Sequence, residues 1–131
     1  MIYLASPYTS RHTGAHARQM EQHARFTIVT RYAAHLKQQG LDVFSPITHG
    51  HPIYLASLTA LDPSAAGWEA VNAAMMAASD ACTVLAIKGW AQSSGVRAEI
   101  QAFEARGIAP KIVPLPACWF DTAMLKTYCQ P

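Results

Sequence analysis

Hydrophobic positions along the chain alternate between short continuous runs and longer stretches with helical spacing. The short runs, each ended by a proline, glycine or polar residue, predict buried strands at residues 1–5, 42–46, 82–87 and 111–115. Apolar residues at helical spacing predict helices at about residues 17–39 and 64–79, and a third helix that ends near Gly107. Residues 47–64 are expected to form a long connection or a short helix, and residues 117–128 a last helix without an assigned position.

The alternation of strands and helices predicts one α/β domain over residues 1–131. Such an order implies a doubly wound parallel sheet of four or five strands, with helices on both faces. Ligands of these sheets bind beyond the carboxyl ends of the strands. Polar residues gather in the three loops that follow the first three strands, so we expect the loops to surround a common pocket. Residues expected near this edge of the sheet are Ser6, Ser45, Lys88 and Gly95.

Composition limits the classes of function. Of the 131 residues, 51% are hydrophobic and 14% are charged, which excludes a disordered chain. The net charge of +2 and the scattered lysines and arginines argue against a nucleic-acid partner but allow a small anionic ligand. The sequence has no CxxC pair, no signal-peptide pattern and no apolar stretch of about 18 residues. We therefore expect a cytoplasmic protein with reduced cysteines and no membrane partner.

The stretch GWAQSSGVRAEI, residues 89–100, contains the main candidate for a catalytic residue. Val96, Ile100 and Phe103 form the apolar stripe of the predicted helix, and Glu99 lies beside this stripe. No charged residue stands three or four positions from Glu99, so no salt bridge within the helix is available. Two interpretations remain for the carboxylate. It complements the positive end of the helix, where it would stay ionised, or it is a preorganised nucleophile or base at the mouth of the sheet.

Two histidines and a basic segment follow the first two strands. His49 and His51 have the spacing of two metal ligands, but no third ligand stands at a convincing distance in the sequence. Polar contacts within the loop or recognition of a nucleobase are therefore favoured, and we expect neither a metal nor a cofactor. For the basic residues within 11–18, the default interpretation is a solvated loop, and the alternative is attraction of a phosphate.

The tryptophans have different expected roles. Trp90 follows the end of a strand, where its ring either stacks on a base or packs over the third helix. Trp68, Met75 and Met76 lie at helical spacing and are expected in the hydrophobic core.

Three segments, MIYLASPYTS, VFSPITHGHP and GWAQSSGVRAEIQAF, together resemble small bacterial and phage proteins related to nucleoside 2-deoxyribosyltransferases. That group also includes nucleoside 5′-monophosphate N-glycosidases. The resemblance extends to about residue 115, and its most specific element is G-W-x-x-S-x-G-V-x-x-E-I. It implies a flavodoxin-like fold, a small-molecule nucleoside or nucleotide as ligand, and a homodimer or larger homo-oligomer in which a partner subunit completes each site.

The resemblance also implies roles for individual residues. Glu99 stands at the position of the nucleophile that attacks C1′ of the sugar, expels the base and forms a glycosyl ester. Water, in a hydrolase, or a second base, in a transferase, would then resolve the ester. Ser93 and the backbone around Gly95 would hold a 5′-phosphate or 5′-hydroxyl at a helix N-terminus. The loop that lines the sugar and base pocket in relatives is matched by Ser6, Pro7 and Tyr8.

One departure from the pattern concerns the leaving base. Relatives carry an acid eight residues before the aspartate that precedes the third strand, and counting back from Asp80 gives Asn72. An amide forms hydrogen bonds but cannot donate an acidic proton at neutral pH. The candidates to protonate the base instead are Glu69, His49 and His51. Two functions therefore remain: an N-glycosidase or transferase, and a nucleotide-sensing module that uses the same pocket without turnover.

Overall fold

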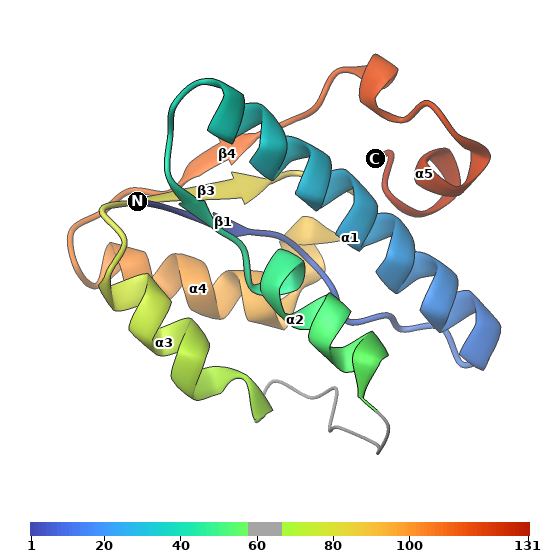
Figure 1. The fold of residues 1–131 in the computed structure, drawn as a ribbon, viewed down its shortest axis with the longest axis horizontal. Coiled ribbons are helices and arrows are strands. Elements are labelled where there is room, and N and C mark those ends of the chain that lie inside the picture. The colour runs from blue at the N-terminus through green and yellow to red at the C-terminus, as the bar shows by residue number, and fades with distance from the viewer. Residues whose placement is uncertain (58–66) are drawn as a thin grey trace.

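The structure is a computed structural model that describes residues 1–57 and 67–131. Its sheet contains β1 (Ile2–Ala5), β2 (Val43–Phe44), β3 (Ala81–Leu85) and β4 (Lys111–Val113), all parallel, in the order β2-β1-β3-β4. The α-helices of the described part are α1 (Ala15–Gln38), α2 (Pro46–Ala56), α3 (Glu69–Ala77), α4 (Ser94–Glu104) and α5 (Ala123–Tyr128). This arrangement confirms the doubly wound, flavodoxin-like α/β fold (Figure 1). Of the described helices, none combines the length and apolar surface that crossing a bilayer requires.

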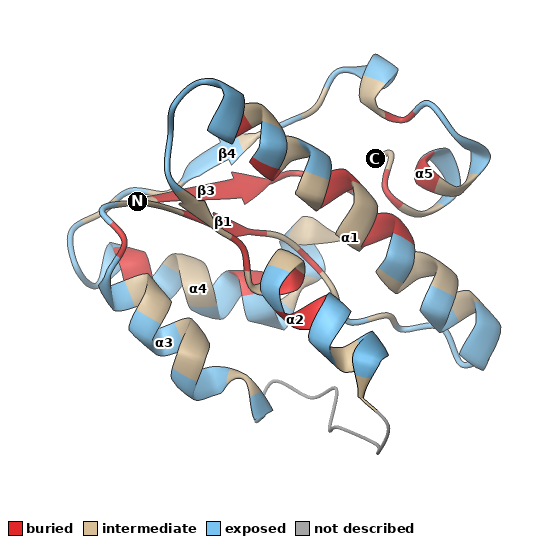
Figure 2. Cartoon of the chain, viewed as in Figure 1, coloured by how far each residue is buried: buried red, intermediate tan, exposed pale blue. Residues whose placement is uncertain are grey.

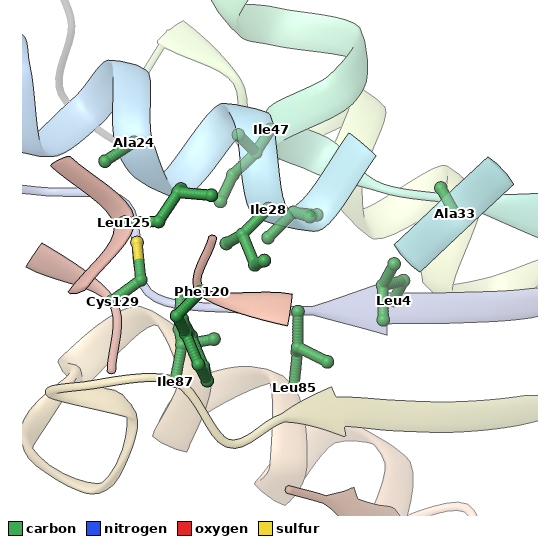
Figure 3. Close-up of a cluster of buried hydrophobic side chains, with 11 residues drawn as sticks. Leu4, Ala24, Ile28, Ala33, Ile47, Leu85, Ile87, Phe120, Leu125 and Cys129 are labelled. Atoms are coloured by element: carbon green, nitrogen blue, oxygen red, sulfur yellow. The ribbon is translucent and has the colours of Figure 1, made fainter. Parts of the chain in front are cut away.

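The two faces of the sheet are covered by different helices because successive side chains of a strand point to opposite faces. Leu4 of β1 belongs to a cluster with residues of α1 and α5, which lie on one face (Figures 1 and 3). Tyr3 and Ala5 belong to a second cluster with Val96 and Phe103 of α4, against which methionines of α3 pack. The central strands are buried, whereas the outer surfaces of the helices are exposed (Figure 2).

The segment after β2 contains a short helix, one of the two arrangements expected for it, and this helix begins immediately after the strand. Ser45 caps α2, since its side chain accepts a hydrogen bond from the Thr48 amide at 3.3 Å. Pro46 occupies the first helical position, where its missing N–H removes no helical hydrogen bond. The sequence SPITH is therefore a helix start, and the strand is confined to Val43–Phe44. The predicted start of the next helix, at residue 64, lies outside the described residues.

The C-terminal segment completes the core on the α1 face. Phe120, Leu125 and Cys129 are buried in the same cluster as Ile28 of α1 (Figure 3). The backbone carbonyl of Cys129 also accepts a hydrogen bond from the Lys88 amide at 2.7 Å. The segment that the sequence left without a position thus packs on α1 and contacts the loop after β3.

Removing the side chain of Leu125 tests this packing. We expect Leu125→Ala to lower the free energy of unfolding by about 2–5 kcal/mol, because the side chain is fully buried and the substitution leaves a cavity. Leu55→Ala is the matched control, since Leu55 is 64% exposed and its loss should cost little. Urea unfolding of both variants measures the difference. Equal, small losses would contradict the packing of α5 against the core.

Candidate functional site

A cavity of about 560 Å³ lies at the carboxyl ends of β1 and β3. Its walls come from the loops after these two strands and from parts of α1, α2, α3 and α4. Both the volume and the position are typical of a small-molecule site in a parallel sheet. The predicted site residues that line the cavity are Ser6, Pro7, Tyr8, Asn72, Ser93, Gly95 and Glu99.

Two of the residues expected at the site lie outside this cavity. His49 is exposed, and its ring lies 5.8 Å from that of Phe44. Because the segment is helical, residues two positions apart lie on opposite sides of it, and His51 lines the cavity instead. Trp90 packs against the cluster of Val96 and Phe103, which corresponds to the packing interpretation of its ring rather than to base stacking.

Residues expected in the core on α3 are divided between the core and the cavity. Met75 and Met76 pack against the second hydrophobic cluster, as predicted. Trp68, just before the helix, is instead half-buried in the wall of the cavity. A Cβ atom on Gly50 would lie 3.6 Å from its ring, at van der Waals distance, so the indole lies beside α2 at this position.

Glu99 is half-buried on α4 and lines the cavity. Its Oε1 atom accepts a hydrogen bond from the Tyr3 hydroxyl at 2.8 Å, and no ion pair to it is formed within the described residues. Burial raises the pKa of Glu99 to about 7, although the Tyr3 hydrogen bond acts in the opposite direction. The effect of the helix dipole is strongest in the first turn of a helix. Because α4 begins at Ser94, Glu99 lies beyond its first turn. The dipole therefore gives this carboxylate little of the support that a first-turn position would provide, and burial brings its pKa towards neutral pH.

The hydroxyl of Tyr3 is a feature that the sequence analysis missed. Tyr3 is fully buried on β1, with its ring 5.8 Å from Phe44 and 5.6 Å from Phe103. Burial first, and then the charge of Glu99, raises the pKa of Tyr3, so the hydroxyl stays protonated and donates to the carboxylate. The apolar run that contains Tyr3 indicates a core position, and the only further signal is that a buried hydroxyl needs a partner.

The N-terminus of α4 forms another wall of the cavity. Ser93 caps the helix, since its Oγ accepts a hydrogen bond from the Val96 amide at 3.3 Å. Ser94 and Gly95 follow in the first turn, whose amides have no partner inside an α-helix. Arg11 donates to the carbonyl oxygen of Gln92 at 3.0 Å, which brings a guanidinium to the same wall. This arrangement of amides and positive charge is suited to an anion.

Arg25, also missed by the sequence analysis, connects the two loops of the site. It is buried on α1, and its guanidinium donates to the carbonyl oxygens of Thr9 at 2.9 Å and of Lys88 at 3.4 Å. Glu21, one turn earlier, pairs with it at 3.1 Å. Gly89 is required beside it, because its φ is 87° and a Cβ there would lie 3.1 Å from the guanidinium. The available signal was the Glu21–Arg25 spacing of four residues on a helix.

Side chains of the types that bind metal ions are not clustered in the described part of the chain. Within residues 1–57 and 67–131, no three His, Cys, Asp or Glu side chains lie close enough together to hold a metal ion.

Residues 1–113 match the model of a protein family described as "Domain of unknown function (DUF1937)". The chain belongs to the DUF1937 family. A comparison with curated proteins gives no match. The DUF1937 region contains every residue that lines the cavity, whereas α5 follows after its end.

Burial of Glu99 makes the stability of this DUF1937 protein depend on pH. The folded chain binds the proton more tightly than the unfolded chain, because the pKa of Glu99 is raised from 4.5 to about 7 on folding. This contribution to stability is complete below about pH 4.5 and is lost as the pH rises through about 7. At 1.4 kcal/mol per pKa unit, it amounts to about 3–4 kcal/mol at most.

We therefore expect Glu99→Gln to be more stable than the wild type at pH 8, by about 1–3 kcal/mol, and to be similar near pH 4.5. Glu104→Gln, on the exposed part of the same helix, is the control and should show no such difference. Urea unfolding at the two pH values measures the effect. A loss of stability in Glu99→Gln at pH 8 would mean that the carboxylate has a structural role.

Proposed function

We propose that the chain cleaves or transfers the N-glycosidic bond of a nucleoside or nucleoside 5′-monophosphate, with Glu99 as the nucleophile. The observation that carries this proposal is the half-buried carboxylate of Glu99 in the cavity, held by the Tyr3 hydroxyl and not neutralised by a cation of the described residues. Such a carboxylate is poorly solvated, so it gains most when positive charge develops on the sugar in an oxocarbenium-like transition state. The resemblance to nucleoside 2-deoxyribosyltransferases supports the same assignment.

The distribution of polar groups in the cavity supports a nucleotide as ligand. One part of the cavity is formed by the α4 N-terminus with its backbone amides and by Lys88 of the loop after β3. Arg11, from the loop after β1, adds a positive charge to this part. The part formed by α2 and α3 presents the rings of His51, Tyr54 and Trp68. A phosphate fits the first part and a planar base the second, which leaves the sugar for the region of Glu99.

The reaction follows from these positions. An oxygen of Glu99 attacks C1′, the C1′–N bond breaks with its electron pair moving to the base, and the base takes up a proton from solvent, which is returned when the attacking water, or the incoming base, loses its proton. The resulting glycosyl ester is attacked at C1′ by water or by a second base, which releases the carboxylate. Tyr3 orients the attacking oxygen through its hydrogen bond. Asn72 lines the cavity and can bind a sugar hydroxyl through its amide.

A second candidate function is a nucleotide-binding module without turnover. Asn72 favours it, because the acid that relatives carry at this position is replaced by an amide that cannot protonate the base. For either function, the resemblance leads us to expect a homodimer or a larger homo-oligomer.

Replacing the nucleophile separates the two functions. With a panel of nucleosides and 5′-monophosphates, we expect release of free base to fall at least about a thousandfold in Glu99→Gln, which corresponds to roughly 4 kcal/mol of barrier. Ligand binding should persist, because the amide keeps its hydrogen bonds, and Glu104→Gln should react like the wild type. The kcat/KM of the wild type should rise with pH through about 7, as Glu99 ionises.

The opposite outcomes are equally informative. Near-normal base release by Glu99→Gln would exclude Glu99 as the nucleophile. Saturable binding of intact nucleotide by the wild type, without release of base, would support the binding module.

The anion site at α4 is tested by Ser93→Ala. Monophosphates should bind more tightly than the matching nucleosides, and the substitution should narrow this gap about tenfold, because a hydrogen bond to a charged group is lost. Ser93 also caps α4, so its loss should cost about 1 kcal/mol of stability. Thr122→Ala removes the corresponding cap of α5, outside the cavity, and should lower stability without changing the gap. Equal affinities for nucleosides and monophosphates in the wild type would count against a phosphate site.

A further inference from the structure

His51 is a buried polar side chain in the cavity wall whose position is fixed by its neighbours. Only 4% of the residue is exposed, and its ring lies 4.6 Å from that of Phe26 and 6.2 Å from that of His23. Its Nδ1 atom is 2.5 Å from the hydroxyl oxygen of Tyr8, which also lines the cavity. The imidazole thus has one nitrogen occupied by a protein hydrogen bond.

The protons of this pair can be assigned from the surroundings. Burial raises the pKa of Tyr8 to about 12, and burial followed by the neighbouring His23 lowers the pKa of His51. At neutral pH the phenol is therefore protonated, and the imidazole is neutral with one N–H. Of the two groups, the phenol is the stronger acid and an unprotonated imidazole nitrogen is the stronger base, so the favoured arrangement has the Tyr8 hydroxyl donating to Nδ1 of His51. The single imidazole proton then lies on Nε2.

The Nε2–H group of His51 is left without an acceptor. It is buried, and no described residue accepts a hydrogen bond from it. Buried donors in native proteins are nearly always paired, because an unpaired one loses its hydration without compensation. The side chain of His51 lines the cavity, so a ligand bound there is the candidate to supply the missing acceptor.

We propose that the Nε2–H group of His51 donates a hydrogen bond to the leaving nucleobase, at a carbonyl oxygen or an unprotonated ring nitrogen. The inference rests on the proposed function, and it makes His51 a catalytic residue and Tyr8 a positioning residue that fixes its tautomer. Breaking the glycosidic bond moves electrons onto the base, so a donor at the base is bound more strongly in the transition state than in the ground state. The hydrogen bond therefore contributes both to rate and to the choice of base.

The experiment compares His51→Phe, which keeps a ring against Phe26 but has no donor, with His51→Gln, whose amide nitrogen reproduces the Nε2 donor. We expect His51→Phe to lower kcat/KM for the nucleoside monophosphate that the wild type cleaves best, and its affinity, at least about tenfold. His51→Gln should recover most of this loss. The affinity for ribose 5-phosphate or deoxyribose 5-phosphate, which lack a base, should stay unchanged in both variants.

The outcomes separate a base contact from a structural role. An equal loss of affinity for the sugar phosphates would show that His51 only supports the cavity, and unchanged kinetics in His51→Phe would also overturn the inference. Tyr8→Phe should lower the affinity for the monophosphate, since Nδ1 loses its donor and the tautomer is no longer fixed. Nitrogen-15 chemical shifts of the wild type provide a test without substitution: a proton on Nδ1 would overturn the inference, and one on Nε2 supports it.

Failure of the proposed function gives a different result. A wild type that neither binds nor cleaves any nucleotide would remove both proposals. A wild type that cleaves nucleotides, with a His51→Phe variant that does so equally well, would remove only the role of His51.

Discussion

The buried guanidinium of Arg25 is the interaction on which the cavity depends. A parallel sheet brings the loops after β1 and β3 to the same edge, but it does not fix how closely they approach. Arg25 donates to carbonyl oxygens of Thr9 and Lys88, one on each loop, and Glu21 balances its charge. A buried charge of this kind is stable only with such partners, so the helix, the two loops and the ion pair require one another. The walls that carry Ser93 and Tyr8 are positioned as a consequence.

The hydrophobic pattern was sufficient to predict the four strands, the main helices and the edge of the sheet where the cavity lies. These features depend on the alternation of apolar residues, which is local in the sequence. Errors arose where the chain pairs residues that are distant in sequence or where a cap decides the outcome. Ser45 and Pro46 decide between the connection and the short helix that were both expected after β2, and the helix brings His51 rather than His49 to the cavity. The Tyr3 contact with Glu99 joins positions 96 residues apart, which no local pattern reveals.

Glu99 shows how burial and hydrogen bonding together set the state of a carboxylate. A cation beside it would have kept it ionised and stable, but it would also have weakened its attraction for a developing positive charge. The Tyr3 hydroxyl orients the carboxylate without removing its negative charge, while burial holds the protonated and ionised forms close in energy near neutral pH. A carboxylate without a compensating cation is thereby kept in the cavity at some cost to the stability of the fold.

The C-terminal segment has a consequence for comparisons within the DUF1937 family. The matched region ends at residue 113 and contains the whole lining of the cavity. Nevertheless, the Lys88 amide is held by the Cys129 carbonyl, and the Lys88 ammonium by the Thr127 carbonyl at 3.2 Å. The segment after β4 therefore helps to hold the loop after β3, although it contributes no residue to the lining of the cavity. The family match alone thus does not delimit the scaffold of the pocket, because residues beyond position 113 support one of its walls.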